Sequence, residues 1–304
     1  MTDPLRAPPA DRSAAELLAF GVINLDKPAG PSAHQVAGWV RDLAAEAAVD
    51  LAPDGPSVDR AAHAGTLDPK VTGCLPMLLG DATRMAQVFL EGRKEYVSVL
   101  ELHGPAPTNL ESVLGEFEAP LYQKPPRKSA VSRRLRVREI YELELLDRTD
   151  RQALIRIQCE SGTYVRKLCH DLGLALGTGA HMGHLRRTAT DPFDDTTLVT
   201  LQSFTDAFEF AREGDEELLR EIVQPAERAL THLPSVEIAP SAAREVATGA
   251  PVYAPGVIRA ADEIDDDALV ACYTPDGSAV CLGRLVGDSD ADSGIVVDLE
   301  RVLV

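Results

Sequence analysis

The 304-residue sequence lacks several features that would mark a membrane or secreted protein. It has no run of about 18 apolar residues, so no membrane-spanning helix is expected. The N-terminal stretch MTDPLRAPPADR is polar and proline-rich, unlike a secretory signal. The five cysteines include no C-x-x-C pair, which favours reduced, buried thiols over disulfides or a zinc site. These absences predict a cytoplasmic protein with no membrane partner.

Lysine is also scarce, with 6 residues against 24 arginines, and 48 acidic residues leave a net charge of −18. Taken alone, this charge argues against a nucleic-acid partner, because phosphates are bound through Lys and Arg. The charge is unevenly distributed, however. Residues 121–187 hold 14 basic and 7 acidic residues, whereas 1–120 and 188–304 are strongly acidic. The basic middle segment leaves nucleic-acid binding open.

The excess of carboxylates and the preference for arginine suggest adaptation to high salt. At molar ionic strength the Debye length shrinks to about 3 Å, so surface carboxylates no longer repel one another. Acidic residues crowd stretches such as 262–267, which have the character of exposed surface. Our hypothesis is that the chain comes from a salt-loving archaeon.

Local patterns in the N-terminal part predict a strand over 20–25 and then a helix. The helix begins at a capping box formed by Ser32 and Gln35. Residues 50–62 are polar and interrupted by proline, so we expect a loop there. The buried face of the helix is predicted from apolar residues at helical spacing: Val36, Trp39, Val40 and Leu43.

The middle of the chain predicts further strands and a helix. Residues 94–103 are rich in Val, Tyr and Leu, and residues 153–160 alternate between apolar and polar side chains, so both stretches favour strands. A helix is predicted from about residue 163 to 176, which places Tyr164 and Arg166 in its first turn.

In the C-terminal third, the pattern of apolar segments changes near residues 230–234. Before this point, residues 205–223 predict a second, acidic amphipathic helix. Beyond it the apolar segments are short and bounded by turns, including a hairpin around Pro275-Asp276-Gly277. Two domains also suit the length. We therefore predict a domain over 1–232 and an all-β module over 233–304.

Asp68 is the position that says most about chemistry. It lies between Gly65 and Gly73 and directly before Pro69, a setting that makes a stiff loop. Such a loop suits a carboxylate that acts as a nucleophile or a general base. A Leu-Asp-Pro tripeptide alone is weak evidence, since Asp is also common in ordinary turns.

Four motifs in order resemble those of the TruB-type pseudouridine synthase family: INLDKPAGPSAHQV at 23–36, HAGTLDPKVTGCL at 63–75, KEYV at 94–97 and CESGTYVRKLCHDLG at 159–173. Residues 123–146 and GAHMGHLRR at 179–187 resemble the archaeal and eukaryotic dyskerin branch. TGAPVYAPGV at 248–257 is similar to part of a PUA domain, an RNA-binding β barrel.

The resemblance implies an α+β fold: a mixed, mainly antiparallel sheet with flanking helices, and a C-terminal PUA barrel on which residues 1–20 could pack. It implies an isomerase that turns uridine into pseudouridine without a cofactor. The substrate would be the T-loop uridine of transfer RNA, position 55. Alternatively, it would be ribosomal RNA, with the chain as catalytic subunit of an H/ACA particle containing guide RNA and small partner proteins.

The resemblance also implies roles for individual residues. Asp68 would attack ribose C1′ or uracil C6, or would remove a ribose proton. Arg166 would pair with Asp68 and keep it ionised in a closed pocket. Tyr96 would stack on the extruded base, and Tyr164 would take the proton from C5. Judged without the motifs, Arg166 could form an ordinary surface ion pair, and the tyrosines could be ordinary core residues.

Further residues complete the predicted site. By the same resemblance, His63 fills the space left by the extruded nucleotide, Leu185 walls the pocket, and Lys27 braces the active-site loop. One departure from the family pattern is Ala64, where relatives often carry Ser or Thr, and at most one hydrogen bond depends on it. The H-x-x-H sequence at 181–184 is too weak a signal for a metal site, and none is expected.

The stretch 124–138 contains seven basic residues and no acidic one, a pattern typical of phosphate contacts. A merely solvated basic strand is the alternative. From this stretch we predict five RNA-binding residues: Lys124, Arg127, Lys128, Arg133 and Arg134.

Two other functions compete with the enzyme. The chain could be a non-catalytic RNA-binding scaffold that uses only the PUA module and the basic strand. It could instead be an RNA methyltransferase, but no G-x-G-x-x-G follows a predicted strand, as a nucleotide cofactor would require. Asp68→Asn separates enzyme from scaffold, because only an enzyme depends on that carboxylate.

Overall fold

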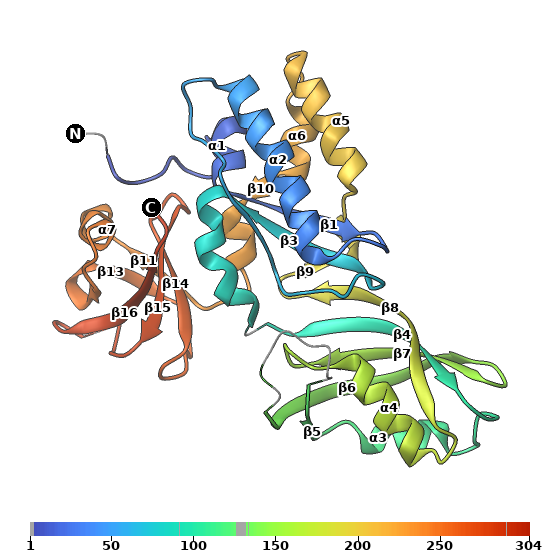
Figure 1. Ribbon diagram of the computed structural model, residues 1–304. Helices are drawn as coiled ribbons and strands as arrows, with labels where there is room; N and C mark the ends of the chain where they lie inside the picture. The colour runs from blue at the N-terminus through green and yellow to red at the C-terminus, as the bar shows by residue number, and fades with distance from the viewer. Residues whose placement is uncertain (1–2, 91, 126–131, 133, 290) are drawn as a thin grey trace.

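The computed structural model describes all residues except 1–2, 91, 126–131, 133 and 290. Its described residues form two β-sheets that lie next to each other (Figure 1). The larger sheet runs the length of the molecule in Figure 1, and the smaller one, in orange and red, lies beside it. This arrangement confirms the predicted α+β class with a strand-rich C-terminal part.

The larger sheet has ten strands within the described residues, in the order β10-β1-β3-β8-β4-β7-β6-β5, with β2 paired to β3 and β9 to β8. Only β3 and β8 run parallel among these described pairs, so the sheet is mixed and mainly antiparallel, as predicted. The strands are β1 Gly21–Lys27, β2 Ala61–His63, β3 Thr72–Leu79, β4 Lys94–Leu102, β5 Pro120–Gln123, β6 Arg136–Arg148, β7 Gln152–Cys159, β8 Ala180–Thr190, β9 Phe193–Asp194 and β10 Gln224–Pro225.

Helices cover both ends of this sheet (Figure 1). The α-helices are α1 Ala14–Ala19, α2 Ala33–Leu51, α3 Leu110–Glu116, α4 Val165–Ala175, α5 Leu201–Arg212 and α6 Glu217–Ile222, and the 3-10 helices are η1 Gly80–Leu90, η2 Asp195–Thr197 and η3 Ala226–Leu230. The predicted capping box is present, because the Ser32 hydroxyl accepts the Gln35 N–H and the Gln35 side chain accepts the Ser32 N–H. It fixes the start of α2 close to the strand that carries Lys27.

The smaller sheet has the order β12-β16-β15-β14-β11-β13. Its elements are β11 Ser235–Ile238, α7 Pro240–Ala247, β12 Val252–Tyr253, η4 Ala254–Gly256, β13 Val257–Ala260, β14 Leu269–Tyr273, β15 Ala279–Leu285 and β16 Ile295–Val302. The predicted hairpin is β14–β15. The prediction of an all-β module was wrong in one respect, because α7 is a helix with Pro240 in its first turn and Ala243 and Val246 buried.

A shared hydrophobic core joins the two sheets. Phe20 and Met85 from the larger part belong to one buried cluster with Leu269 and Leu282 of the smaller sheet. The N-terminal segment adds polar contacts, since the Arg6 Nε donates to the Leu303 carbonyl over 2.9 Å. In Figure 1 this dark blue segment runs past the C-terminal strands before it reaches α1.

Two further sequence predictions need correction. Trp39 was expected on the buried face of α2, but it is 48% exposed, because it lies at the margin of the stripe defined by Val36 and Val40. The single helix predicted over 205–223 is two helices, α5 and α6. Gly214, with φ of +96°, lies in the break between them.

In the part of the chain that the structure describes, no helix is both long and apolar enough to cross a membrane. All five cysteines are buried free thiols.

Candidate active site

Asp68 lies on the loop between β2 and β3, and backbone hydrogen bonds hold this loop on two sides. The Val71 N–H donates to the Asp68 carbonyl over 3.0 Å, and the Gly30 N–H donates to the Pro69 carbonyl over 2.8 Å. Gly65 has φ of +96°, a conformation that glycine adopts at little cost. The carboxylate is therefore carried by a constrained loop, in agreement with the sequence pattern.

Lys27, the last residue of β1, ties this loop to the sheet. Its side chain is fully buried, and its Nζ donates to three backbone carbonyls at 2.8 to 3.2 Å, those of Pro28, Pro69 and Val71. Burial lowers the pKa of Lys27, and the Asp68 carboxylate opposes this shift. Two of the three carbonyls, those of Pro69 and Val71, belong to the Asp68 loop, so Lys27 holds this loop against the end of β1.

The structure brings Asp68 and Arg166 together although 97 residues of chain separate them. An Arg166 Nη atom lies 3.0 Å from Asp68 Oδ2, and the two side chains are 40% and 46% exposed. Arg166 stands in the first turn of α4, whereas Asp68 stands on the β2–β3 loop. The pair is open to solvent, so a substrate can reach the carboxylate.

Tyr164 lies at the N-cap of α4, so the helix begins at Val165, two residues after the predicted start at 163. Among the described residues, its own side chain does not cap the helix. Its backbone is instead held by Gln123 from β5, whose Oε1 accepts the Tyr164 N–H over 2.8 Å. Gln123 was not singled out from the sequence.

Tyr96 and Leu185 lie on the adjacent strands β4 and β8. Leu185 is buried, and Tyr96 is partly buried directly opposite Arg187 in the strand register. Burial raises the pKa of Tyr96, and the nearby Arg187 guanidinium opposes the shift. Tyr96 is therefore a neutral phenol near neutral pH, which suits a stacking surface better than a proton acceptor.

His63, at the end of β2, is a neutral imidazole near neutral pH, because burial lowers its pKa. Its Nδ1 is buried and has no hydrogen-bond partner among the residues that the structure describes. An unpaired buried nitrogen is unfavourable unless another group supplies a hydrogen bond.

Arg187 is a buried residue near this site that the sequence analysis overlooked. It is 2% exposed, and its guanidinium donates to the carbonyls of Cys74 and Gly65 over 2.7 and 3.3 Å. It therefore holds the Asp68 loop in place through the backbone carbonyl of Gly65. The signal was available, because Arg187 ends the GAHMGHLRR motif, but only Leu185 of that motif was singled out.

Lys94, the first residue of β4, is a second buried cation. Its Nζ donates to the carbonyls of Phe89 and Gly92 over 2.8 and 3.1 Å. Burial lowers the pKa of Lys94 from 10.5 to about 8, and the Arg187 charge adds to the shift.

This shift predicts how stability depends on pH. Between about pH 8 and 10.5 the unfolded chain holds a proton on Lys94 that the folded chain has lost, so the free energy of unfolding rises with pH. We expect wild type to gain on the order of 1–3 kcal/mol over Lys94→Met across this window. Urea unfolding of both proteins at several pH values measures the difference. A difference that does not change with pH would contradict the prediction.

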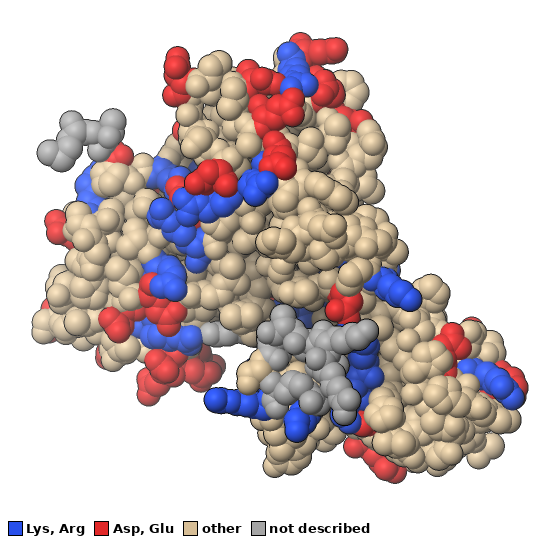
Figure 2. Space-filling view, viewed as in Figure 1, with Lys and Arg blue, Asp and Glu red and all other residues tan. Residues whose placement is uncertain are grey.

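The predicted RNA-binding residues divide into described and undescribed ones. Lys124 and Arg134 are exposed, whereas Arg127, Lys128 and Arg133 lie outside the described residues. Figure 2 shows Lys and Arg side chains around strands β5–β7, while carboxylates predominate over α2, α5 and α6 at the top. Arg138, from the same basic stretch, is engaged within the protein, 2.7 Å from Glu160.

No group of three or more metal-ligating side chains occurs among the described residues. Of the H-x-x-H pair, His181 instead contacts His103, with Nδ1 and Nε2 2.9 Å apart.

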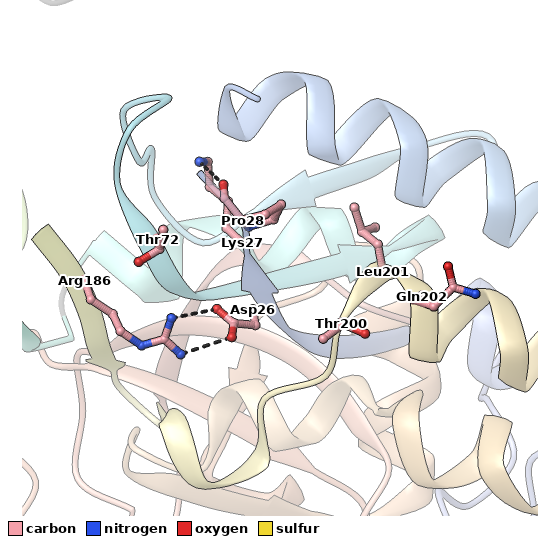
Figure 3. Close-up of a pocket in the computed structure, with 8 residues that line it drawn as sticks. All are labelled: Asp26, Lys27, Pro28, Thr72, Arg186, Thr200, Leu201 and Gln202. Carbon is pink, nitrogen blue, oxygen red and sulfur yellow. Dashed lines mark hydrogen bonds and ion pairs between the residues drawn. The ribbon is translucent and has the colours of Figure 1, made fainter. Parts of the chain in front are cut away.

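A pocket of about 360 Å³ lies beside Lys27, which is one of the residues that line it (Figure 3). Arg186 extends from β8 to form two hydrogen bonds with Asp26, at 3.0 and 3.1 Å, while Lys27 points away from this pair. The start of α5, at Leu201, closes the opposite wall. Because Asp68 does not line this pocket, we place the candidate active site at the Asp68–Arg166 pair instead.

Comparison with protein families accounts for nearly the whole chain. Four family models match in order: the DKCLD domain at residues 4–37, the N-terminal domain of TruB family pseudouridylate synthases at 56–165, the C-terminal domain of tRNA pseudouridylate synthase B at 166–231, and the PUA domain at 234–303. The fold is thus that of an RNA-modifying isomerase with an appended PUA domain.

The chain belongs to the TruB family of pseudouridylate synthases. It is 62% identical to the Haloarcula marismortui protein named "Probable tRNA pseudouridine synthase B", over 99% of this chain and 94% of that protein. It is equally similar to the Halobacterium salinarum protein of the same name, over 99% of both chains. Both proteins come from halophilic archaea, in agreement with the acidic composition of this chain.

Solved structures place the chain near the dyskerin-like branch. A Cbf5-Nop10-Gar1 complex contains a chain with 41% identity and a TM-score of 0.89, covering 100% of this chain and 91% of that one. An H/ACA ribonucleoprotein bound to a substrate RNA containing 2′-deoxyuridine gives 40% identity and a TM-score of 0.87, with the same coverage.

Proposed function

We propose that this chain isomerises uridine to pseudouridine in RNA, using Asp68 as the reacting carboxylate. The substrate is the T-loop uridine of transfer RNA, position 55, or a uridine in ribosomal RNA selected by an H/ACA guide RNA. The observation that carries the proposal is the Asp68–Arg166 ion pair at 3.0 Å, at a solvent-open site on a constrained loop. No cofactor is required, because the uracil that leaves ribose C1′ is also the group that returns.

The proposed chemistry breaks the bond between ribose C1′ and uracil N1, rotates the base, forms a bond from C1′ to C5 and releases the C5 proton. Asp68 attacks C1′ or C6, or removes a ribose proton, and these three routes remain open. Arg166 stabilises the carboxylate once the RNA has excluded water. Tyr164 accepts the C5 proton, and the neutral Tyr96 stacks on the extruded base.

The remaining residues shape the site. Leu185 walls the pocket beside Tyr96, and Lys27 holds the Asp68 loop. His63 fills the gap that the extruded nucleotide leaves, and the RNA supplies the hydrogen bond that its buried Nδ1 lacks among the described residues. Support for this arrangement comes from the sheet, in which β4 with Tyr96 pairs with β8 with Leu185, while the strands that carry Lys27 and His63 both pair with β3.

Binding is proposed to involve the basic stretch and the C-terminal domain. Lys124 and Arg134, together with Arg127, Lys128 and Arg133, contact phosphates. We divide the chain into a catalytic domain at 1–232 and an RNA-binding PUA domain at 233–304. Partners are transfer RNA, ribosomal RNA or guide RNA, with small H/ACA proteins, because relatives with the same fold occur in such complexes. The proposed setting is the cytoplasm, where thiols such as the five free cysteines stay reduced.

The test is a tritium-release assay on RNA labelled at C5 of uridine, since C5 loses its hydrogen when it bonds to C1′. The protein is incubated in molar KCl with unmodified transfer RNA or ribosomal RNA fragments, with and without guide RNA and the small partner proteins. Release from transfer RNA alone supports the stand-alone enzyme, and release only with guide RNA supports the particle. RNA binding without release under every condition would overturn the proposal in favour of a scaffold.

High salt should also be needed for folding. The acidic surface predicts that the melting temperature rises by roughly 10 °C or more between dilute buffer and about 3 M KCl, because screening removes carboxylate repulsion. Circular dichroism during heating, at several KCl concentrations, measures this. Equal stability in dilute and molar salt would contradict the halophilic interpretation.

A further inference from the structure

The turn at residues 160–163 joins β7 to α4 and so determines where Tyr164 and Arg166 stand. Building on the proposed function, we propose that the hairpin of β5 and β6 is a clamp on this turn. It acts through Gln123 and through the Arg138–Glu160 ion pair. These three residues do not contact the reacting atoms; they are positioning residues for Tyr164 and Arg166.

Gln123 makes the first contact of the clamp. It is the last residue of β5 and 2% exposed, so its amide group sits in the interior. Its Oε1 accepts the Tyr164 N–H over 2.8 Å, and its Nε2 donates to the Tyr164 carbonyl over 3.4 Å. Both polar groups of one backbone unit are thus held by a side chain from another strand. Loss of the short bond would leave a partly buried N–H unpaired, which is costly.

The second contact fixes Glu160, at the other end of the turn. Arg138 Nη1 donates to Glu160 Oε1 over 2.7 Å, and Glu160 Oε2 accepts the Glu139 N–H over 3.1 Å. The Glu160 N–H in turn donates to the Glu139 carbonyl over 2.9 Å. The backbone and both carboxylate oxygens of Glu160 are therefore attached to β6.

The turn itself packs against the Arg138 guanidinium. Gly162 has φ of +81°, and a Cβ atom there would lie 3.3 Å from Arg138 Nε. The N–H and the hydroxyl of Thr163 both donate to the Glu160 carbonyl, over 3.2 and 2.7 Å. From Glu160 onward the turn thus forms one hydrogen-bonded unit that rests on Arg138 and leads directly into α4.

This geometry separates Arg138 from its basic neighbours. Its head group is directed at Glu160, and the pair is only 23% and 38% exposed. Arg134 is exposed, and it has no carboxylate partner among the described residues.

A phosphate contact and a positioning residue affect different measurements, so the two roles can be told apart. Removing a phosphate contact weakens RNA binding and lowers its salt dependence. Removing a positioning residue lowers the rate on bound RNA, because a displacement of about 1 Å can cost roughly 100-fold.

The experiment compares Arg138→Met, Glu160→Gln and Gln123→Met with two reference variants. Arg156→Met is the matched control, because it breaks another ion pair between β7 and β6, the pair with Glu144. Arg134→Met removes a proposed phosphate contact. It uses the full chain, together with whichever RNA and partners support wild-type tritium release. Single-turnover rates are measured with enzyme in saturating excess, and RNA affinity is measured over a range of KCl concentrations. For each clamp variant we expect a rate lower by roughly 10- to 100-fold, with RNA affinity within about twofold.

Two further variants test the Arg138–Glu160 pair directly. Arg138→Lys should recover most of the rate, since one N–H donor suffices for the 2.7 Å bond. The double variant that carries both Arg138→Met and Glu160→Gln should be no slower than the slower of the two single variants, because both changes break the same ion pair. Arg156→Met should keep the rate on bound RNA, whereas Arg134→Met should bind RNA more weakly and show a salt slope smaller by about 1.

The clamp is overturned if Arg138→Met reacts at the wild-type rate and only binds RNA more weakly, or if Glu160→Gln and Gln123→Met react at the wild-type rate. Glu160→Gln keeps the shape of the side chain, so it tests the pair even if Arg138→Met does not fold. An inactive wild type would contradict the proposed function. An active wild type with fully active clamp variants would contradict only the clamp.

Discussion

Asp68→Asn is expected to lower the rate of pseudouridine formation by more than about 10³-fold while RNA affinity changes little. The amide keeps the size of the carboxylate but has no charge, and it can serve neither as a nucleophile nor as a proton acceptor. The prediction holds for each of the three routes, because all of them use the carboxylate. Tritium release under single-turnover conditions gives the rate, and filter binding of the same RNA gives the affinity.

Asp26→Asn provides the matched control for this variant. Asp26, like Asp68, is a partly exposed carboxylate paired with an arginine, at 3.0 Å from Arg186. It lies in a pocket that Asp68 does not line, so its loss should leave the rate within about threefold, as for other surface ion pairs. Full activity in Asp68→Asn would show that another residue reacts with the substrate. Equal loss in both variants would point to a general effect on folding.

The local features of this site could be predicted from the sequence, because short-range patterns determine them. Ser32 and Gln35 form their capping box within four residues. The alternation along β7 places Ile155 and Ile157 in the core, as expected from a period of two. The constrained loop around Asp68 likewise follows from the glycines and the proline beside it.

Contacts between distant segments could not be derived in this way. The Arg166–Asp68 pair was expected only through the family resemblance, since no local pattern joins residues on α4 and the β2–β3 loop. Gln123 was missed because a buried glutamine that holds the backbone of another element has no signature in its own segment. Arg138 was counted in the basic stretch typical of phosphate contacts, because composition cannot show that Glu160 lies beside it.

Arg12→Met is expected to cause a larger loss of stability than the removal of any ion pair described above. The Arg12 side chain is 2% exposed and meets Glu227, 10% exposed, through two hydrogen bonds of 2.7 and 2.9 Å. Glu227 also accepts the Ala279 N–H of β15 over 3.2 Å, so the pair joins the N-terminal segment, η3 and the smaller sheet. Without Arg12 a buried carboxylate remains uncompensated, which costs about 3–5 kcal/mol.

Urea unfolding in molar KCl measures this loss, and Arg212→Met serves as the control. Arg212 has three carboxylate partners but sits at the surface, at 32% side-chain exposure, so screening should keep its loss below about 1 kcal/mol. Combining Arg12→Met with Glu227→Met removes both charges, and this double variant should be more stable than Arg12→Met alone. A double variant less stable than either single variant would mean that the other contacts of Glu227, including the one with the Ala279 N–H, outweigh the buried charge. Because the buried pair is shielded from salt, it can hold the two sheets together in a solvent that weakens the surface pairs.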